Sequence, residues 1–176
     1  LLTPIAKAFS TDVANKITEI GIQIHGGMGF IEETGAAQYM RDARILPIYE
    51  GTNAIQANDF MFRKTLKDNG LTAKIFLNEM VEDCKDNIQM TNMQNLAVET
   101  LDYVLNNRDD YEKLSCISFD YMMGFGYLIG GWLMHKAKIK ARLKLSNKNQ
   151  NEIFLKSKII SSDFYNLHIL PRIQSH

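Results

Sequence analysis

Apolar side chains recur at every third or fourth position along most of this chain, which is the spacing of an amphipathic helix. Thr3 and Pro4 make a good helix start, as an N-cap and a first-turn proline, and Gly26 and Gly27 are expected to end the helix. The stripe between them comprises Ile5, Phe9, Val13, Ile17, Ile20 and Ile24. No stretch alternates convincingly between apolar and polar residues as a strand does. The pattern predicts an all-α fold.

Shorter elements are expected after this first helix. The glycine pair should open into a loop at residues 28–30, and a short helix should cover residues 35–41. Pro47 disfavours a helix immediately before it, so it separates that short helix from a further one. The further helix is expected to begin near Gly51 or Thr52. The expected buried side of this helix comprises Ile55, Phe62 and Leu66.

Asn69-Gly70 is expected to end that helix and to mark a boundary between two domains, residues 1–70 and 71–176. A helix over residues 71–88 should follow. Further apolar stripes comprise Met90, Met93, Ala97, Leu101 and Val104; then Leu114, Ile117, Tyr121, Phe125, Leu128, Trp132, Ile139 and Leu143; then Ile153, Ile160, Phe164 and Leu167. We therefore expect part of one helical bundle followed by a second helical domain.

Composition and charge narrow the class of protein. The 176 residues are 45% hydrophobic and 23% charged, as in an ordinary globular protein, and 20 basic side chains balance 20 acidic ones. This balance does not favour nucleic acid or an anionic membrane as a partner. The longest apolar run, residues 122–134, is broken by glycines and is shorter than the roughly 20 residues that span a bilayer. Cys84 and Cys116 are too few for a disulfide framework, which favours a cytoplasmic location.

The candidate chemistry is carried by Glu50, which lies in the sequence IYEGT between apolar and small residues. Burial of a carboxylate in such surroundings disfavours its charged form and makes it a stronger base. An exposed glutamate is a feeble base, so we expect neighbours such as Ile48 and Tyr49 to exclude water from Glu50. A helix N-terminus at the same place acts in the opposite direction, because it stabilises the charged form.

Three motifs in a fixed order resemble the C-terminal signature of acyl-CoA dehydrogenases: QIHGGMGF at residues 23–30, MRDAR at 40–44 and IYEGTNAIQ at 48–56. The resemblance covers roughly residues 2–64. A glycine turn combined with a Tyr-Glu-Gly-Thr helix start is far more specific than a lone glycine motif. GGWL at 130–133 and FYNLHILPR at 164–172 are more loosely similar to the extra helical domain of a subgroup of larger members, which includes 3-methylmercaptopropionyl-CoA dehydrogenase.

The resemblance implies oxidation of an acyl-CoA thioester to the trans-2-enoyl-CoA, in which a base removes the α-proton while a hydride passes from the β-carbon to FAD. Glu50 matches the family's base, and Gly51 matches the position that lines the thioester. The backbone N–H of Glu50, with a flavin ribityl hydroxyl, is the expected donor to the thioester carbonyl. The implied electron acceptor is an electron-transfer flavoprotein, with an acyl-CoA oxidase as a close variant. The acyl chain is left open.

The resemblance also implies a homo-oligomer in which FAD is shared between subunits. The positions that match contacts to the adenosine and pyrophosphate of a neighbouring subunit's FAD are Gln23, Gly26 and Gly27. The positions that match the stretch beside the same subunit's FAD are Thr52, Asn53 and Ala54. Glycine permits close backbone approach, and a hydroxyl and N–H groups at a helix start suit phosphate or flavin oxygens.

Other interpretations of prominent residues are weaker. The GGMG turn follows a helix and lacks the Gly-x-Gly-x-x-Gly spacing of a dinucleotide-binding strand-turn-helix. The charges of Arg41, Asp42 and Arg44 are more typical of a salt-bridged clamp than of a catalytic cluster. His135 lies on an apolar stripe, as a core or interface histidine does, and His25 has no metal-ligand pattern around it.

Two features of the second half favour structural roles. The basic run from residue 136 to 144 has its charges at alternate positions, which scatter around a helix and favour a solvated surface over a nucleic-acid site; its members are Lys136, Lys138, Lys140, Arg142 and Lys144. Met90, Met93 and Trp132 are typical of core packing or subunit contact.

The chain starts at Leu1, without a Met, shortly before a complete catalytic motif. We therefore expect a piece of a longer enzyme or the relic of a degraded gene, which lacks an N-terminal helical domain, a β-domain and the first helices of the C-terminal bundle. Such a piece is expected to be inactive alone. Two functional hypotheses follow: a fragment of an FAD-dependent acyl-CoA dehydrogenase, and a catalytically inactive helical oligomerisation remnant of such an enzyme.

Overall fold

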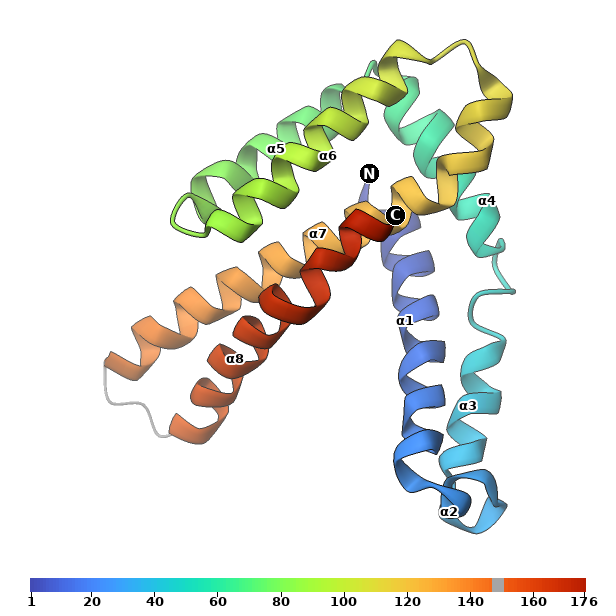
Figure 1. Ribbon diagram of the computed structural model, residues 1–176, viewed down its shortest axis with the longest axis vertical. Coiled ribbons are helices and arrows are strands. Elements are labelled where there is room, and N and C mark those ends of the chain that lie inside the picture. Colours follow the sequence, from blue (N-terminus) through green and yellow to red (C-terminus); the bar gives the residue numbers. More distant parts are fainter. Residues whose placement is uncertain (147–150) are drawn as a thin grey trace.

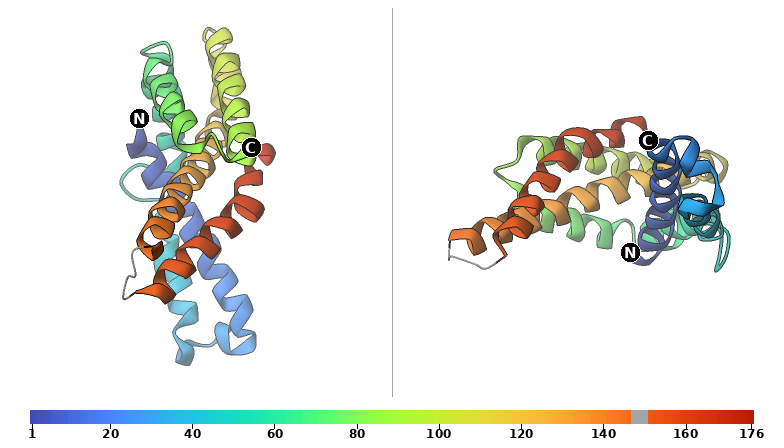
Figure 2. Two further views of the ribbon diagram at one scale, coloured as in Figure 1. Left: turned by 90° about the vertical axis from the view of Figure 1, so that its left-hand side faces the viewer. Right: turned by 90° about the horizontal axis from the view of Figure 1, so that it is seen from below.

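A computed structural model describes residues 1–146 and 151–176, and the regular elements in these residues are all helical. The all-α prediction is therefore confirmed. The helices pair as hairpins, α1 with α3, α5 with α6 and α7 with α8, and the hairpins spread from a common centre (Figure 1). Both termini lie near this centre. The α5–α6 hairpin and the α1–α3 hairpin extend in opposite directions from it (Figure 2).

The α-helices are α1 (Leu2–His25), α2 (Gly27–Phe30), α3 (Ala36–Arg44), α4 (Asn53–Asn58), α5 (Leu71–Cys84), α6 (Ile88–Asn106), α7 (Tyr111–Ser146) and α8 (Glu152–Phe164). Short 3-10 helices are η1 (Glu32–Thr34) and η4 (Leu170–Ser175). Wide π-helical turns form η2 (Asp59–Leu66) and η3 (Tyr165–Ile169). η2 continues α4, and η3 and η4 continue α8 toward the C-terminus.

The first hairpin departs from the central core and forms an arm, which we define as residues 11–44. The side chains buried in the arm are all small and lie between α1 and α3: Ala36, Ala37 and Ala43. Asn15 ties the two helices together, because its side-chain amide donates to the Ala43 carbonyl at 2.9 Å and to the Thr11 carbonyl at 2.8 Å. Small residues therefore allow close helix packing here without a hydrophobic core.

The central bundle, which we define as α4 to α7 with η4, contains the core. Phe60, Tyr121 and Phe125 pack as an aromatic cluster with ring centroids 5.0–5.3 Å apart. The largest fully buried side chains are Phe60, Phe125, Met61, Leu77, Met80, Met90, Leu101, Leu114, Met122, Leu128, Leu170 and Val104. The core thus spans both sides of the expected domain boundary at Gly70, and that boundary stays a prediction.

Glycines of α7 allow two neighbouring elements to approach its backbone. A Cβ at Gly126 would lie 2.9 Å from the Cβ of Phe9 and closer still to the ring of that residue. A Cβ at Gly131 would lie 2.9 Å from both Leu170 and Met90. Since such distances are shorter than carbon contacts allow, only glycine permits this packing.

Several helix boundaries differ slightly from those predicted. α1 begins at Leu2, one residue before the expected Thr3 N-cap, and it ends as expected at Gly26, whose φ is 61°. Residues 28–30 are not a loop, because α2 forms one helical turn there. A Cβ at Gly29 would overlap the Ile22 carbonyl, so this glycine lets the turn fold back on α1.

The short helix is longer than expected, since α3 continues to Arg44. The helix after Gly70 is shorter than expected. It ends at Cys84, and Asn87 then caps α6 by accepting the Met90 N–H at 3.2 Å. Periodicity predicts a single helix over residues 71–88, but the Asn87 side chain caps a second helix that begins within this segment.

The side expected to be buried in the α4–η2 helix is only partly correct, since of its three members Leu66 alone is buried. Ile55 is exposed and Phe62 is half-buried, whereas Phe60 and Met61 are fully buried. Ile55 lies in α4, whose buried residues are Asn53 and Ala57. After Asp59, the π-helical turn of η2 accommodates an extra residue and shifts the buried face relative to an α-helix. Thr65 stabilises this turn, because its hydroxyl donates to the Phe60 carbonyl at 2.9 Å.

The apolar stripes at the outer ends of the hairpins are exposed rather than buried. In α1 the predicted stripe is buried at Ile5 and half-buried at Phe9 and Val13, while its last three members are exposed: Ile17, Ile20 and Ile24. In α7 the stripe is exposed at Ile139 and Leu143. The α8 and η3 stripe is exposed throughout: Ile153, Ile160, Phe164 and Leu167. Periodicity identified these faces correctly but not what they contact.

The core interpretations are confirmed, and the clamp interpretation is confirmed for Arg41. His135 is buried, as are Met90, Met93 and Trp132, and the Trp132 indole donates to Asp83 at 2.8 Å. In the basic run, Lys136 pairs with Asp83 and Lys138 pairs with Asp163 at the α7 surface. Arg41 forms a bidentate pair with Glu32, with both N···O distances 2.7 Å. No helix in the described residues is long and apolar enough to cross a membrane.

Candidate functional site

Glu50 lies in a short loop between α3 and α4, near the base of the arm (Figure 1). The backbone of Glu50 is left-handed, with φ at 54°, and Gly51 follows with φ at 84°. A left-handed conformation at a residue that is not glycine costs about 1–3 kcal/mol, and such residues cluster at functional sites. The loop therefore holds its carboxylate in a backbone conformation that needs support from its surroundings.

Hydrogen bonds close this loop at both ends. The N–H of Asn53 donates to the Pro47 carbonyl at 3.1 Å, and Thr52 caps α4 by accepting the Ile55 N–H at 3.3 Å. The side-chain amide of Gln56 reaches back to the Glu50 carbonyl at 3.5 Å. Within the described residues, the N–H of Glu50 has no hydrogen-bond acceptor. That donor is available to a ligand.

Gly51 is required by its conformation and by its neighbours. Its positive φ disfavours any side chain, and a Cβ there would lie 3.1 Å from the Gln56 amide nitrogen. Substitution would therefore disturb the contact between Gln56 and the Glu50 carbonyl.

Asn53 is the buried residue of this segment, and its side chain joins α4 to α1. Its Oδ1 accepts from the Lys7 ammonium at 2.8 Å and from the Thr11 hydroxyl at 3.3 Å. Its Nδ2 lies 3.0 Å from the Thr11 oxygen and donates to the Ala8 carbonyl at 3.2 Å. Sequence reasoning missed Lys7 and Thr11, which have no motif of their own and lie more than 40 residues from Asn53.

Asp12 adds a carboxylate beside this network. Its pKa is raised above the usual range because burial outweighs the hydrogen bond from Asn53 and the charges of Lys7 and Arg44. These groups bring two cations and one carboxylate to the junction of α1, α3 and α4. The junction is therefore a polar connection rather than part of the hydrophobic core.

The expected burial of Glu50 by its neighbours is wrong for this chain. Glu50 is exposed, and Ile48 and Tyr49 are 49% and 45% exposed. The reason is local, because the side chains of Ile48 and Tyr49 do not pack against the bundle. Among residues 45–54, only Asn53 is buried. Exclusion of water from Glu50 thus needs contacts that residues 1–146 and 151–176 do not supply.

The other predicted cofactor positions lie at the far end of the arm. Gln23 is exposed in the last turn of α1, and Gly26 and Gly27 are exposed at the turn into α2 (Figure 1). From Thr11, which contacts Asn53, to Gln23 the helix rises about 18 Å at 1.5 Å per residue. The chain therefore presents two separate segments, and only Thr52, Asn53 and Ala54 lie beside Glu50.

Hydrogen bonds also order the tip of the arm. The Thr34 hydroxyl donates to the Met28 carbonyl at 2.7 Å, and a ring nitrogen of His25 lies 2.8 Å from the Gly21 carbonyl. In the part of the chain that the structure describes, no cluster of three His, Cys, Asp or Glu residues could hold a metal ion. The glycine turn is thus held by the protein's own groups.

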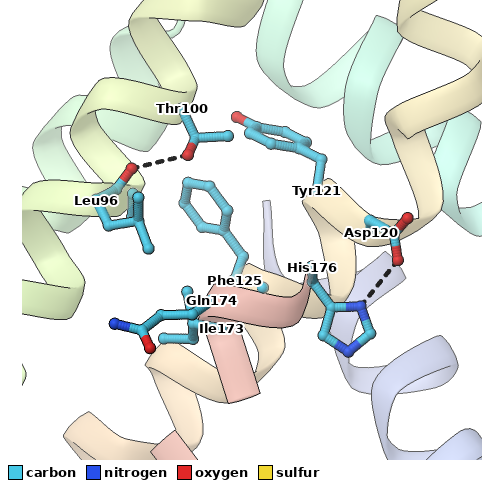
Figure 3. A pocket seen from close by; sticks show the side chains of 10 residues that line it. Leu96, Thr100, Asp120, Tyr121, Phe125, Ile173, Gln174 and His176 are labelled. Carbon is cyan, nitrogen blue, oxygen red and sulfur yellow. Dashed lines mark hydrogen bonds and ion pairs between the residues drawn. The ribbon is translucent and has the colours of Figure 1, made fainter. Parts of the chain in front are cut away.

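A cavity of about 220 Å³ lies in the central bundle, between α6, α7 and η4 (Figure 3). Phe125, Leu96 and Ile173 form apolar walls of this cavity. At the rim, a ring nitrogen of His176 lies 2.8 Å from the Asp120 carboxylate. None of the predicted site residues lines this cavity, so it is separate from the Glu50 loop.

Two protein families match parts of the sequence. Residues 2–64 match "Acyl-CoA dehydrogenase, C-terminal domain", and residues 62–176 match "Acetyl-CoA dehydrogenase C-terminal like". The two matches together cover both the Glu50 loop and the later hairpins. The chain belongs to the acyl-CoA dehydrogenase family, whose members are oxidoreductases.

Similar proteins extend this assignment. The chain is 40% identical over 182 residues to the 3-methylmercaptopropionyl-CoA dehydrogenase of Ruegeria pomeroyi, covering 96% of this chain and 31% of that protein. It is 30% identical over 195 residues to a broad-specificity linear acyl-CoA dehydrogenase of Mycobacterium tuberculosis, covering 99% of this chain and 32% of that protein. A short-chain specific acyl-CoA dehydrogenase of Megasphaera elsdenii is 52% identical over 52 residues, covering 30% of this chain and 14% of that protein. The chain thus spans about a third of the first two relatives.

Proposed function

We propose that this chain supplies the catalytic base and part of the FAD site of an acyl-CoA dehydrogenase that oxidises an acyl-CoA thioester to the trans-2-enoyl-CoA. The observation that carries the proposal is the left-handed pair Glu50-Gly51, which holds an exposed carboxylate in a strained turn. The motif around this pair lies in the part of the chain that matches the acyl-CoA dehydrogenase C-terminal domain.

In this proposal Glu50 takes the proton from the carbon next to the thioester carbonyl. The C–H bond breaks, its electron pair moves toward the carbonyl, and a hydride leaves the β-carbon as the double bond forms. The free N–H of Glu50 donates to the carbonyl oxygen, where negative charge develops. Gly51 allows the thioester to approach. FAD, when bound, would supply the hydride acceptor.

The residues matched to FAD contacts fit a large polar ligand. A Cβ added at Gly26 or Gly27 would meet no atom within 4 Å, so the backbone of this turn is open to approach. Gln23, Thr52 and Ala54 are exposed. A cofactor contact by Asn53 stays a prediction, since its side chain already bonds to α1.

The proposal includes a homo-oligomer in which the arm tip of one subunit reaches the FAD of its neighbour. Two observations support it: residues 23–27 are remote from Glu50, and the arm exposes large apolar side chains that favour burial in an interface. These side chains are Ile17, Ile20, Ile24, Met28, Phe30 and Tyr39. We further propose an electron-transfer flavoprotein as the acceptor. The two free thiols fit a cytoplasmic enzyme.

A fusion enzyme tests the proposed function. This chain would replace the matching C-terminal part of the Ruegeria relative, so that the remaining domains are supplied by that protein. We expect a yellow fusion whose flavin is bleached anaerobically by 3-methylmercaptopropionyl-CoA or butyryl-CoA. Glu50→Gln should retain the flavin and slow bleaching by about 10²–10⁴-fold, because the general base is lost.

Glu33→Gln is the matched control, since Glu33 is an exposed glutamate of the arm and has no proposed role. It should leave the bleaching rate unchanged. If the Glu50→Gln fusion bleaches as fast as the parent fusion, the assignment of the base is wrong. Rapid reoxidation of the reduced flavin by air, rather than by an electron-transfer flavoprotein, would indicate an oxidase.

The second hypothesis, an inactive oligomerisation remnant, is favoured by the exposed apolar face of α8. Ile153, Ile160 and Phe164 are 87%, 68% and 56% exposed. A fusion that binds no flavin, together with a 176-residue chain that sediments as an oligomer, would support this hypothesis. Phe164→Asp should then dissociate the oligomer, because a charge on the contact face is costly to bury.

A further inference from the structure

We infer that Asn53, together with Lys7 and Thr11, positions Glu50 for proton abstraction; this inference rests on the function proposed above. None of the three is placed to touch the reacting atoms. They act by fixing the end of the Glu50 loop to α1 through hydrogen bonds of 2.8–3.3 Å. They are positioning residues.

The first argument is the distribution of burial along the loop. From residue 45 to residue 54, Asn53 alone is buried, at 6% exposure, and the remaining side chains are half-buried or exposed. The loop therefore has no fully buried apolar side chain, since Leu46 and Pro47 are only half-buried. Its connection to the rest of the protein is polar and concentrated at one residue.

The second argument is the completeness of the Asn53 contacts. A neutral side-chain amide has an acceptor oxygen and a donor nitrogen, and both are used here toward α1. The Asn53 N–H also donates to the Pro47 carbonyl, which closes the loop across Glu50. One residue thus joins both ends of the loop to a helix.

The third argument is the strain of the segment between these ends. Glu50 and Gly51 are left-handed, and within the described residues neither of their N–H groups has an intramolecular acceptor. A strained conformation persists only when the surrounding structure determines it. Loss of the Asn53 anchor should therefore allow Glu50 to relax toward an ordinary φ and move its carboxylate.

The chemical consequence follows from the sensitivity of proton transfer to geometry. A misplacement of about 1 Å is enough to slow an enzymatic step about 10²-fold. Binding of the acyl-CoA, which extends over a much larger surface, depends less on this single side chain. Loss of the anchor should thus reduce kcat far more than it changes KM.

The experiment uses the fusion enzyme described above. We expect Asn53→Ala to retain flavin, to slow flavin reduction by saturating acyl-CoA about 10–100-fold, and to change KM by less than about threefold. Lys7→Met should slow reduction by a smaller factor, and Lys7→Arg, which keeps a cationic donor, should restore most of the rate. A rate for Asn53→Ala equal to that of the parent fusion would overturn the inference.

Gln94→Ala is the matched control for lost stability. Gln94 is a side-chain amide as buried as Asn53, at 4% exposure, and it donates to the Leu77 carbonyl at 2.6 Å, within the α5–α6 hairpin. Its loss should destabilise the chain without slowing flavin reduction. An equal slowing by Gln94→Ala would reduce the Asn53 effect to general destabilisation and so contradict the inference.

The Glu50→Gln fusion separates this inference from the proposed function. If Glu50→Gln does not slow bleaching, the function fails; if it does but Asn53→Ala does not, only the positioning role fails. A second measurement covers a fusion that does not fold. In NMR spectra of the 176-residue chain, Asn53→Ala should shift Glu50 from a left-handed to an ordinary φ, as read from its N–H to Hα coupling and intraresidue contact, and an unchanged Glu50 would overturn the inference.

Discussion

The arm and the central bundle use apolar side chains in opposite ways. In the bundle, Phe60 and Met61 are fully buried and Phe125 is 2% exposed. In the arm, Ile24 and Phe30 are 78% and 79% exposed, and the buried side chains are alanines. Yet both regions show helical periodicity in sequence. An apolar stripe therefore identifies a surface that favours a partner, without saying whether the partner belongs to the same chain.

This difference also separates stability from function. The bundle contains the aromatic core, whereas the Glu50 loop and the glycine turn lie in or beside the arm, where few apolar contacts exist. Regions with few buried contacts open at lower free energy than the core of the same protein. We therefore expect the two regions to respond differently to substitution.

The largest contrast is expected between two phenylalanines. Phe60→Ala should lower the free energy of unfolding by about 3–5 kcal/mol, because it leaves a cavity within the aromatic cluster. Phe30→Ala in the arm should change it by less than about 0.5 kcal/mol. Urea unfolding of the 176-residue chain, followed by circular dichroism, measures both. Comparable losses would show that the arm is part of the core.

A second contrast concerns the contact between α7 and α1. Gly126→Ala should cost about 1–3 kcal/mol, because the new Cβ would overlap Phe9 and displace α1. Gly124→Ala, on the same helix but with no atom within 4 Å of its Cβ position, should stabilise by up to about 1 kcal/mol. Opposite signs in thermal unfolding would verify the packing. Equal effects would contradict it.

A third, more local effect is expected within the arm. Asn15→Ala removes the side-chain link from α1 to the Ala43 carbonyl and should lower local stability by about 1 kcal/mol. Hydrogen exchange should accelerate in α1 beyond Thr11 and in α3, with the α5 to α7 amides unchanged. Faster exchange throughout would mean that arm and bundle unfold as one unit.

The smallest effect is a pH dependence of the bundle. Burial, with the nearby charge of Lys138, lowers the pKa of His135 below its ordinary value of 6.5. The unfolded chain therefore binds a proton first as the pH falls, so stability should decrease below about pH 6.5 and continue to decrease toward the lowered pKa. His135→Gln should flatten this slope in urea titrations between pH 7 and pH 5, and His25→Gln in the arm should not.

Much of the fold was predictable from sequence, because apolar periodicity indicates helices, and glycines and capping residues indicate where they begin and end. Gly26 ended α1 as predicted. The misassigned faces have two physical causes. The π-helical turn of η2 changes the residue period within a continuous helix, and nothing in Phe60 to Thr65 signals this in advance. The exposure of the outer apolar stripes, such as Ile160 in α8, could not be predicted without knowing which surfaces they contact.

The site was predictable only as far as its motif. The sequence around Glu50 indicated the family and the loop before a helix. It did not predict the left-handed φ of Glu50, which depends on the whole loop, or the exposure of that residue. Lys7 and Thr11 were not predicted, because their role arises from tertiary contact with Asn53. Residues that act through distant side chains carry no local pattern.

The 36-residue helix α7 has a consequence for how this chain tolerates change in length. Gly126 receives Phe9 from α1, Gly131 receives Leu170 from η4, and Trp132 bonds to Asp83 from α5. One inserted residue between Gly126 and Gly131 would rotate everything beyond it by about 100° around the helix axis. The α1 contact and the α5 and η4 contacts would then face incompatible directions. Insertions and deletions should therefore accumulate between the helices, while α7 keeps its length.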